Sequence, residues 1–152
     1  MKKRLLILYH SQQGHTEKLA KACREGALME KGVDVQLKRA FEVELKDIEE
    51  ADGLIIATPE YFGYMSGAVK DFFDRTYYPS REKELQLPYC LLICCENDGS
   101  GAKRHIETIA SGYILRKALE TLIIREHELK DRINEAKELG QTFAAGLVLG
   151  IF

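Results

Sequence analysis

Short apolar runs bounded by turn residues recur along the chain and predict β-strands. The runs cover residues 5–9, 33–37, 54–57, 89–95 and 121–124. The first, third and fourth runs are continuously apolar, as in strands that are covered on both faces. The second run alternates apolar and polar residues, like a strand near a sheet edge. The pattern therefore predicts a five-stranded sheet with buried central strands.

Segments with helical spacing of apolar residues separate these strands. They cover residues 17–31, 44–51, 67–77, 102–119 and 131–149. Val69, Phe72 and Phe73, for example, follow the spacing of a helix face that packs on a core. Because strands alternate with helices, we predict a right-handed, doubly wound α/β fold with parallel strands. Ligands of such folds bind beyond the carboxyl ends of the strands, so the loops after the first, third and fourth strands are the candidate site.

The loop after the first strand has the residues of an anion-binding turn. The candidate phosphate residues are Ser11, Gln12, Gln13, Gly14, His15 and Thr16. Backbone N–H groups and the positive end of the helix dipole converge at a helix N-terminus, so a phosphate can be held there without a lysine. Small polar residues also cap helices that bind no ligand, and the loop alone leaves this alternative open. The motifs GxxxxGK[ST] and GxGxxG are absent, which argues against a nucleoside triphosphate or a Rossmann dinucleotide site.

The loop after the third strand is rich in large apolar side chains that are costly to leave in water. Its candidate residues are Pro59, Glu60, Tyr61, Phe62, Gly63, Tyr64 and Met65. Aromatic faces together with backbone N–H and C=O groups suit a flat conjugated ring. The alternative for Phe62 and Met65 is packing in the core or at a subunit interface. Ser66 is expected to cap the helix that follows.

The loop after the fourth strand contributes glycines and polar side chains. Its candidate residues are Glu96, Asn97, Asp98, Gly99 and Gly101. The glycines permit close approach of the backbone to a ligand, and Asn97 or Asp98 can bond a polar ring edge or a ribityl hydroxyl. Together the three loops would bring phosphate binding, ring stacking and edge recognition to one rim of the sheet.

Composition and charge narrow the classes of partner. The 152 residues match the size of one domain, and we expect residues 1–152 to form a single unit. The 22 Lys and Arg residues against 24 Asp and Glu residues give a net charge of -2, which provides no basic field for nucleic acid. Polar residues 10–12 interrupt the apolar start, so it predicts a strand rather than a signal peptide or membrane span. We therefore expect a cytoplasmic chain.

Cysteines and histidines form no motif for a metal or a nucleophile. Cys90, Cys94 and Cys95 lie in an apolar run without a CxxC spacing. We expect reduced, buried thiols that pack as small apolar side chains. The four histidines are spread over separate segments, and the Cys-x5-Arg motif of a small tyrosine phosphatase is absent. The sequence thus predicts no metal site and gives no support for a cysteine nucleophile.

Three segments in a fixed order carry a more specific pattern. Residues 6–16 form the first loop with its preceding strand, and residues 57–67 contain Thr-Pro-x-x-Phe-Gly-x-Met-Ser-Gly. Residues 72–76 then read Phe-Phe-Asp-Arg-Thr. These segments resemble the flavodoxin-like FMN proteins. The resemblance is nearest to the tryptophan-repressor-binding-protein type of NAD(P)H:quinone oxidoreductase and to the related NADPH-dependent FMN reductases.

The resemblance implies a fold, a cofactor and an assembly. The fold would be a three-layer flavodoxin-like sandwich with five parallel strands in the order 2-1-3-4-5 and helices on both faces. The cofactor would be FMN, with its phosphate on residues 11–16 and its isoalloxazine ring between residues 59–65 and residues 96–101. NAD(P)H would be the electron donor, and the chain would form a homodimer or homotetramer.

The leading functional hypothesis is an FMN-dependent NAD(P)H oxidoreductase that transfers hydride through the flavin to a quinone or similar small acceptor. The alternative is a flavodoxin-like FMN electron carrier without its own NAD(P)H site. Such carriers are typically strongly acidic, so the net charge of -2 favours the reductase. A third hypothesis is a module that keeps the sheet but binds no FMN. None of the three involves nucleic acid or a membrane.

Overall fold

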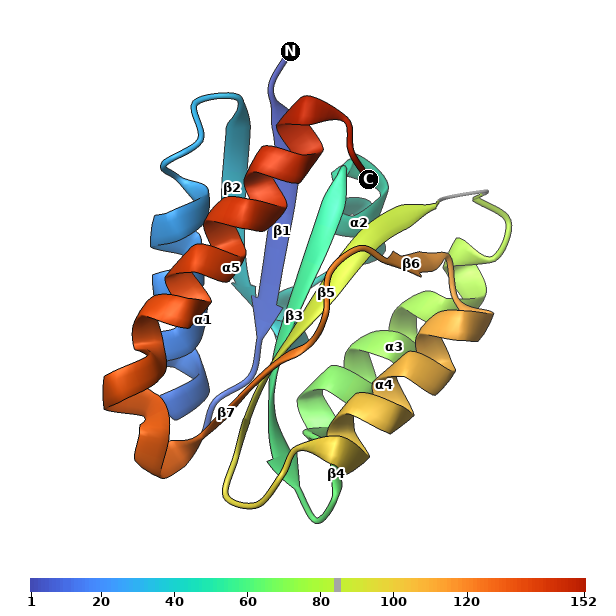
Figure 1. Cartoon of the computed structure of the whole chain (residues 1–152). Helices are drawn as coiled ribbons and strands as arrows, with labels where there is room; N and C mark the ends of the chain where they lie inside the picture. The colour runs from blue at the N-terminus through green and yellow to red at the C-terminus, as the bar shows by residue number, and fades with distance from the viewer. Residues whose placement is uncertain (84–85) are drawn as a thin grey trace.

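A parallel sheet forms the centre of the computed structural model, which describes residues 1–83 and 86–152 (Figure 1). Its parallel strands are β1 (Lys3–Tyr9), β2 (Val33–Arg39), β3 (Gly53–Tyr61), β5 (Leu87–Cys95), β6 (Leu115–Lys117) and β7 (Leu122–Arg125). β2, β1, β3 and β5 lie side by side in that order, and both β6 and β7 pair with the outer edge of β5. The predicted flavodoxin-like sandwich with strand order 2-1-3-4-5 is therefore confirmed.

Two short strands, rather than one, occupy the fifth position of the sheet. β6 pairs with the first residues of β5, and β7 pairs with its last residues. The predicted helix over residues 102–119 is wrong after Gly112, because α4 (Ser100–Gly112) ends there and the chain continues into β6. Hydrogen bonding to the neighbouring β5 backbone outweighs the local helical spacing, which is a weak signal over so few residues.

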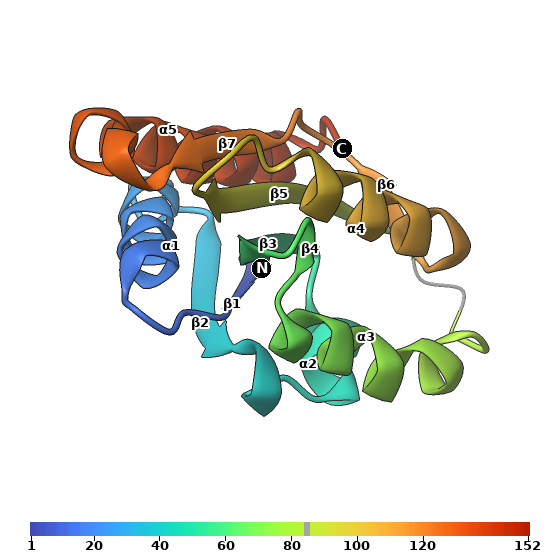
Figure 2. The same ribbon diagram turned by 90° about the horizontal axis from the view of Figure 1, so that it is seen from below.

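Helices cover both faces of the sheet (Figure 2). α1 (His15–Ala27) and α5 (Leu129–Leu149) pack on one face, and α2 (Leu45–Glu50), α3 (Gly67–Ser80) and α4 pack on the other. Successive side chains of β1 alternate between the two cores: Leu5 and Ile7 face α1 and α5, whereas Leu6 and Leu8 face the other helices. This double burial explains the continuous apolar runs in the central strands.

The short elements depend on tertiary contacts and are not predicted. They are β4 (Tyr64–Met65) and the 3₁₀ helices η1 (Ala40–Glu42) and η2 (Glu126–Glu128). The predicted cap of α3 is confirmed, because Ser66 Oγ accepts a hydrogen bond from the Val69 N–H at 3.4 Å. Across the described part of the chain, no helix has both the length and the apolar character to cross a membrane.

The carboxylate of Glu60 joins the end of β3 to the start of α4. Its Oε1 accepts a hydrogen bond from the Gly99 N–H at 3.2 Å, and its Oε2 accepts one from the Ala102 N–H at 3.0 Å. A negative charge is favoured at a helix N-terminus, where these N–H groups have no partner within the helix. Gly101 also packs so closely on Gly63 that a Cβ atom would collide with the Gly63 carbonyl oxygen. The β3–β4 hairpin and α4 therefore form one unit, which carries two of the three candidate loops.

We predict that Glu60→Gln lowers the free energy of unfolding by about 1 kcal/mol, because the new amide nitrogen cannot accept a hydrogen bond. Urea unfolding followed by circular dichroism measures the change. Glu96→Gln is the matched control: Glu96 is an exposed carboxylate in the loop after β5, and its replacement should change stability by less than about 0.5 kcal/mol. Equal stability of Glu60→Gln and the unmodified chain would contradict the capping role.

Candidate functional site

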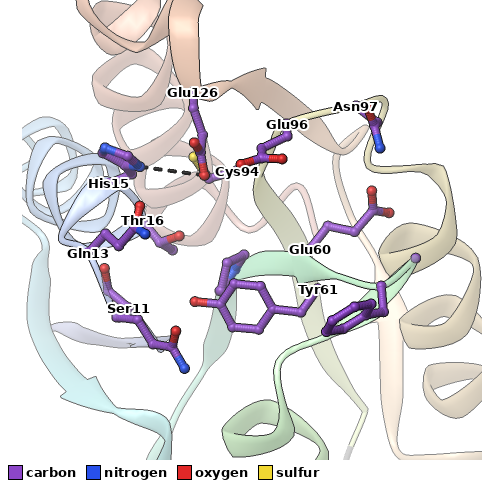
Figure 3. A pocket seen from close by; sticks show the side chains of 14 residues that line it. Ser11, Gln13, His15, Thr16, Glu60, Tyr61, Cys94, Glu96, Asn97 and Glu126 are labelled. Carbon is purple, nitrogen blue, oxygen red and sulfur yellow. Dashed lines mark ion pairs between the residues drawn. The ribbon is translucent and has the colours of Figure 1, made fainter.

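A cavity of about 380 Å³ opens at the carboxyl ends of the central strands, and all three candidate loops contribute to its wall (Figure 3). Its lining residues are Ser11, Gln12, Gln13, His15, Thr16, Pro59, Glu60, Tyr61, Phe62, Gly63, Cys94, Glu96, Asn97 and Glu126. Small-molecule sites typically enclose roughly 300–1,000 Å³, so the cavity has the size of a ligand site. The structure thus brings residues from all three loops to one place.

The first turn of α1 contributes backbone donors to this cavity. α1 begins at His15, after an N-cap residue, Gly14, in a left-handed conformation with φ of 96°. Ser11 Oγ accepts a hydrogen bond from the Gly14 N–H at 2.9 Å, which leaves the Ser11 hydroxyl proton free to donate. No side chain in the described part of the chain caps α1. Its first N–H groups therefore stay open to an anion.

The β3–β4 hairpin ends in a strained turn of two residues beside the cavity. Tyr61 pairs with Tyr64, and Phe62 and Gly63 between them have φ angles of 53° and 69°. Glycine adopts such angles readily, but a residue with a side chain costs about 1–3 kcal/mol there. The Phe62 ring lies fully exposed at the tip of the turn. Strain of this kind is concentrated at functional positions.

Tyr61 projects from the end of β3 toward the first loop (Figure 3). Burial raises the pKa of its phenol, and the nearby backbone of Gln12 opposes that rise. The phenol therefore lies beside the loop after β1. Tyr61 thus lies between the β3–β4 hairpin and the loop that precedes α1.

The residues of the loop after β5 have two roles: some line the cavity, and one bonds to the start of α4. Glu96 and Asn97 line the cavity. Asp98 Oδ1 instead accepts hydrogen bonds from the Ser100 N–H at 2.9 Å and from the Ser100 hydroxyl at 2.8 Å. The Ser100 N–H, followed by its hydroxyl, lowers the pKa of Asp98. Asp98 thus stabilises the start of α4.

The remaining predicted residues lie outside the cavity lining. They are Gly14, Tyr64, Met65, Asp98, Gly99 and Gly101. Met65 is buried in the core, and the Tyr64 ring packs edge to face on His105 with ring centroids 4.6 Å apart. Gly99 is the left-handed N-cap of α4, with φ of 71°, and Gly101 is the residue that contacts Gly63. Met65, Gly99 and Gly101 hold the loops in place from behind the cavity wall, whereas Gly14 shapes the turn at the start of α1.

Cys94 and Glu126 also line the cavity, and neither is predicted as a site residue from the sequence. Cys94 is buried and free, like the other three cysteines, and burial raises the pKa of its thiol to about 12. A neutral thiol is not an effective nucleophile. Glu126 begins η2, directly after β7. The end of that strand at the same sheet edge is the sequence signal that could have identified Glu126.

Acidic side chains dominate the charge of the cavity wall. Glu60, Glu96 and Glu126 line it, and His15 is the one basic side chain among its described lining residues. His15 Nδ1 lies 3.5 Å from Glu126 Oε1, and the two groups form an ion pair when the imidazole is protonated (Figure 3). Within residues 1–83 and 86–152, no group of three or more His, Cys, Asp or Glu side chains is placed to hold a metal ion. The cavity therefore offers backbone donors and aromatic surface rather than a cationic cluster.

Two curated relatives align with part of the chain. An NAD(P)H dehydrogenase (quinone) of Acidithiobacillus ferrooxidans is 36% identical over 93 residues, covering 48% of this chain and 46% of that protein. A flavodoxin of Aquifex aeolicus is 37% identical over 71 residues, covering 47% of this chain and 38% of that protein. The chain thus spans less than half the length of these two relatives.

Solved structures share the fold at low sequence identity. A flavodoxin from the domain Archaea has a TM-score of 0.77 at 20% identity, covering 95% of this chain and 98% of that chain. A WrbA-like flavodoxin from Agrobacterium tumefaciens has a TM-score of 0.77 at 17% identity, covering 96% and 98%. Rubredoxin oxygen:oxidoreductase from Desulfovibrio gigas reaches 0.81 at 15% identity, covering 99% of this chain but 38% of that one. These likenesses establish the flavodoxin-like fold.

A family model for NADPH-dependent FMN reductases matches residues 38–128, which is more than half of the chain. The match includes the loops after β3 and β5 and extends to Glu126, whereas the loop after β1 precedes it. The matched region therefore supplies most of the cavity wall, and the fold agrees with the flavodoxin-like structures above. The chain belongs to the NADPH-dependent FMN reductase family.

Proposed function

We propose that the chain is an FMN-dependent NAD(P)H oxidoreductase that passes hydride through the flavin to a quinone or a similar small acceptor. One observation carries the proposal: a single cavity has open backbone donors at the start of α1 and an aromatic turn at the end of β3. A ligand with a phosphate at one end and a flat ring at the other matches this arrangement. The family of the chain and its quinone dehydrogenase relative support the same chemistry.

The donor set of the cavity fits FMN. The phosphate would lie on the first turn of α1, and the ring would lie against the β3–β4 hairpin, with the loop after β5 on its other side. The proposed contact residues are Ser11, Gln12, Gln13, Gly14, His15, Thr16, Pro59, Glu60, Tyr61, Phe62, Gly63, Glu96 and Asn97. The residues behind the wall, including Met65 and Gly101, would position these contacts rather than make them.

Bound FMN supplies a ring that accepts hydride from NAD(P)H and passes it to the acceptor, so the protein needs no nucleophile or general base of its own. The role of this chain is to orient the bound flavin. Glu60 holds the hairpin on α4, and Tyr61 projects from the hairpin toward the loop after β1. The hairpin therefore keeps a fixed position relative to α4 and to the loop that precedes α4. Fixed geometry of this kind lowers the entropic part of the barrier to hydride transfer.

The charge of the cavity favours an uncharged electron acceptor. Glu60, Glu96 and Glu126 line the wall, and its described lining residues include no Lys or Arg. A negatively charged acceptor would be repelled, whereas a quinone carries no charge. By the same reasoning, NAD(P)H would insert its nicotinamide ring and keep its phosphates outside the cavity.

The proposal extends to the organisation and location of the protein. Residues 1–152 would form a single FMN-binding domain that associates as a homodimer or homotetramer. Phe62 on the hairpin and Tyr78 on α3 present large exposed rings that a second subunit would bury. The four buried free thiols fit a reducing compartment, so we place the protein in the cytoplasm, without a nucleic-acid or membrane partner.

The proposal predicts that the purified chain binds added FMN and then oxidises NADH or NADPH in the presence of a quinone. Flavin fluorescence reports binding, and NAD(P)H absorbance reports turnover. Gly14→Ala should weaken FMN binding about tenfold, because a Cβ atom strains the left-handed turn. Gly112→Ala is the control, because Gly112 lies at the end of α4 and no atom lies within 4 Å of the added Cβ. This substitution should leave the affinity for FMN unchanged. A chain that fails to bind FMN would overturn the proposal.

A flavodoxin-like electron carrier is the second candidate. It is favoured by the flavodoxin relative of Aquifex aeolicus and by the cavity wall, whose described residues include no Lys or Arg for the phosphates of NAD(P)H. Reductive titration of the FMN-loaded chain separates the two candidates. Uptake of both electrons together supports the reductase, whereas a persistent one-electron stage without NAD(P)H turnover supports the carrier.

Phe62→Asn tests whether strain at the hairpin turn serves flavin binding. Asparagine tolerates the left-handed conformation, so the substitution should raise the free energy of unfolding by about 1 kcal/mol. It should also weaken the binding of FMN and of riboflavin to a similar extent, because the lost ring would contact the part that both ligands share. Phe41→Asn is the control, since Phe41 is exposed but has no left-handed conformation to relieve. Unchanged flavin affinity in Phe62→Asn would rule out the ring contact.

A further inference from the structure

Glu126 places a carboxylate at the anion-binding end of the cavity. It reaches the cavity from η2, after β7, and its side chain points toward His15 and Cys94 (Figure 3). The Glu126 and His15 side chains are 35% and 36% exposed, so both are partly screened from water. His15 is the first residue of α1, at the positive end of that helix. Glu126 therefore lies where a phosphate would be held.

The other two carboxylates of the cavity wall are placed differently. Glu60 is committed to the N–H groups at the start of α4. Glu96 is exposed in the loop after β5. Among the described residues, the ion-pair partner of Glu126 is His15. Glu126 is thus the cavity carboxylate that interacts with the basic side chain at the anion-binding end, which is His15.

The charge of Glu126 acts on several groups of the cavity. After burial, which is the larger cause, Glu126 contributes to the raised pKa of Cys94. It also contributes to the raised pKa of Tyr61, again after burial. A negative charge that disfavours a thiolate and a phenolate also disfavours a phosphate in the same place. The unfavourable potential therefore reaches the ends of β5 and β3, and the 3.5 Å contact between Glu126 and His15 brings it to the first turn of α1.

We propose that Glu126 is an internal competitor for the flavin phosphate and determines how strongly this site distinguishes FMN from riboflavin. The inference rests on the proposed function. In the free protein, the Glu126 carboxylate pairs with His15. A bound phosphate displaces it from His15 and is then repelled by it. Glu126 weakens the binding of a flavin that carries a phosphate and leaves the binding of one without a phosphate unchanged, which keeps FMN exchangeable.

Glu126→Gln tests this role, because it removes the charge and nearly preserves the shape of the side chain. We expect the dissociation constant for FMN to fall about tenfold, while that for riboflavin stays within about twofold. The FMN difference should shrink in high salt, because both charges are partly exposed. Glu120→Gln is the matched control: its side chain is 89% exposed between β6 and β7, so it removes one charge from the protein without touching the cavity.

The outcomes separate this inference from the proposed function. FMN binding with equal affinity by the unmodified chain and Glu126→Gln would overturn the role of Glu126 and leave the proposed function standing. An equal gain in riboflavin affinity in Glu126→Gln would also overturn the role of Glu126, because the effect would not involve the phosphate. Binding of FMN by neither chain would overturn the proposed function. In that case, titration with inorganic phosphate, followed by NMR of the His15 ring, tests the role of Glu126 alone. Equal phosphate affinity of the unmodified chain and Glu126→Gln would overturn that role.

Discussion

Parallel hydrogen bonding among β1, β3 and β5 is the constraint on which the cavity depends. In this register Tyr9 pairs with Ala57, and Pro59 pairs with Cys94, so the three strands end at the same edge of the sheet. Side chains from both faces of the strands fill the two cores. A slip by one residue would exchange the faces of every side chain in a strand, so the packing on both faces fixes the register. The loops that follow these strands are therefore held at fixed separations.

The helices that begin at this edge differ in how their N-termini are satisfied. Ser66 caps α3 and Glu60 caps α4, whereas no described side chain caps α1. An absent cap costs about 1 kcal/mol, and a left-handed Phe62 costs a similar amount. Both costs fall on the cavity wall and not on the supporting contacts behind it. In the proposed function these are the groups that meet the two ends of FMN, so the local instability is offset when the ligand binds.

Local sequence patterns predict the strands, most helices and the three loops, because each is determined by side chains that are near one another in the chain. The helix stripe of Val69, Phe72 and Phe73 is buried as predicted. The helix over residues 102–119 is wrong at its end because β6 forms only by pairing with β5. The partners of Glu60 are 39 and 42 residues away, and no local pattern carries such a pairing. The loop residues are thus predictable, but the division between ligand contacts and supporting contacts is not.

An anion-binding site made of backbone donors compensates the charge of a phosphate less than one made of arginines does. A helix N-terminus carries about half an elementary charge, whereas each arginine carries a full charge. Here the basic side chain at the start of α1 is His15, which is already paired with Glu126. A phosphate would gain hydrogen bonds in this place but little compensation of its charge. It follows that contacts with the flat ring would supply most of the affinity for FMN, while the carboxylate at the other end would set how readily the cofactor leaves.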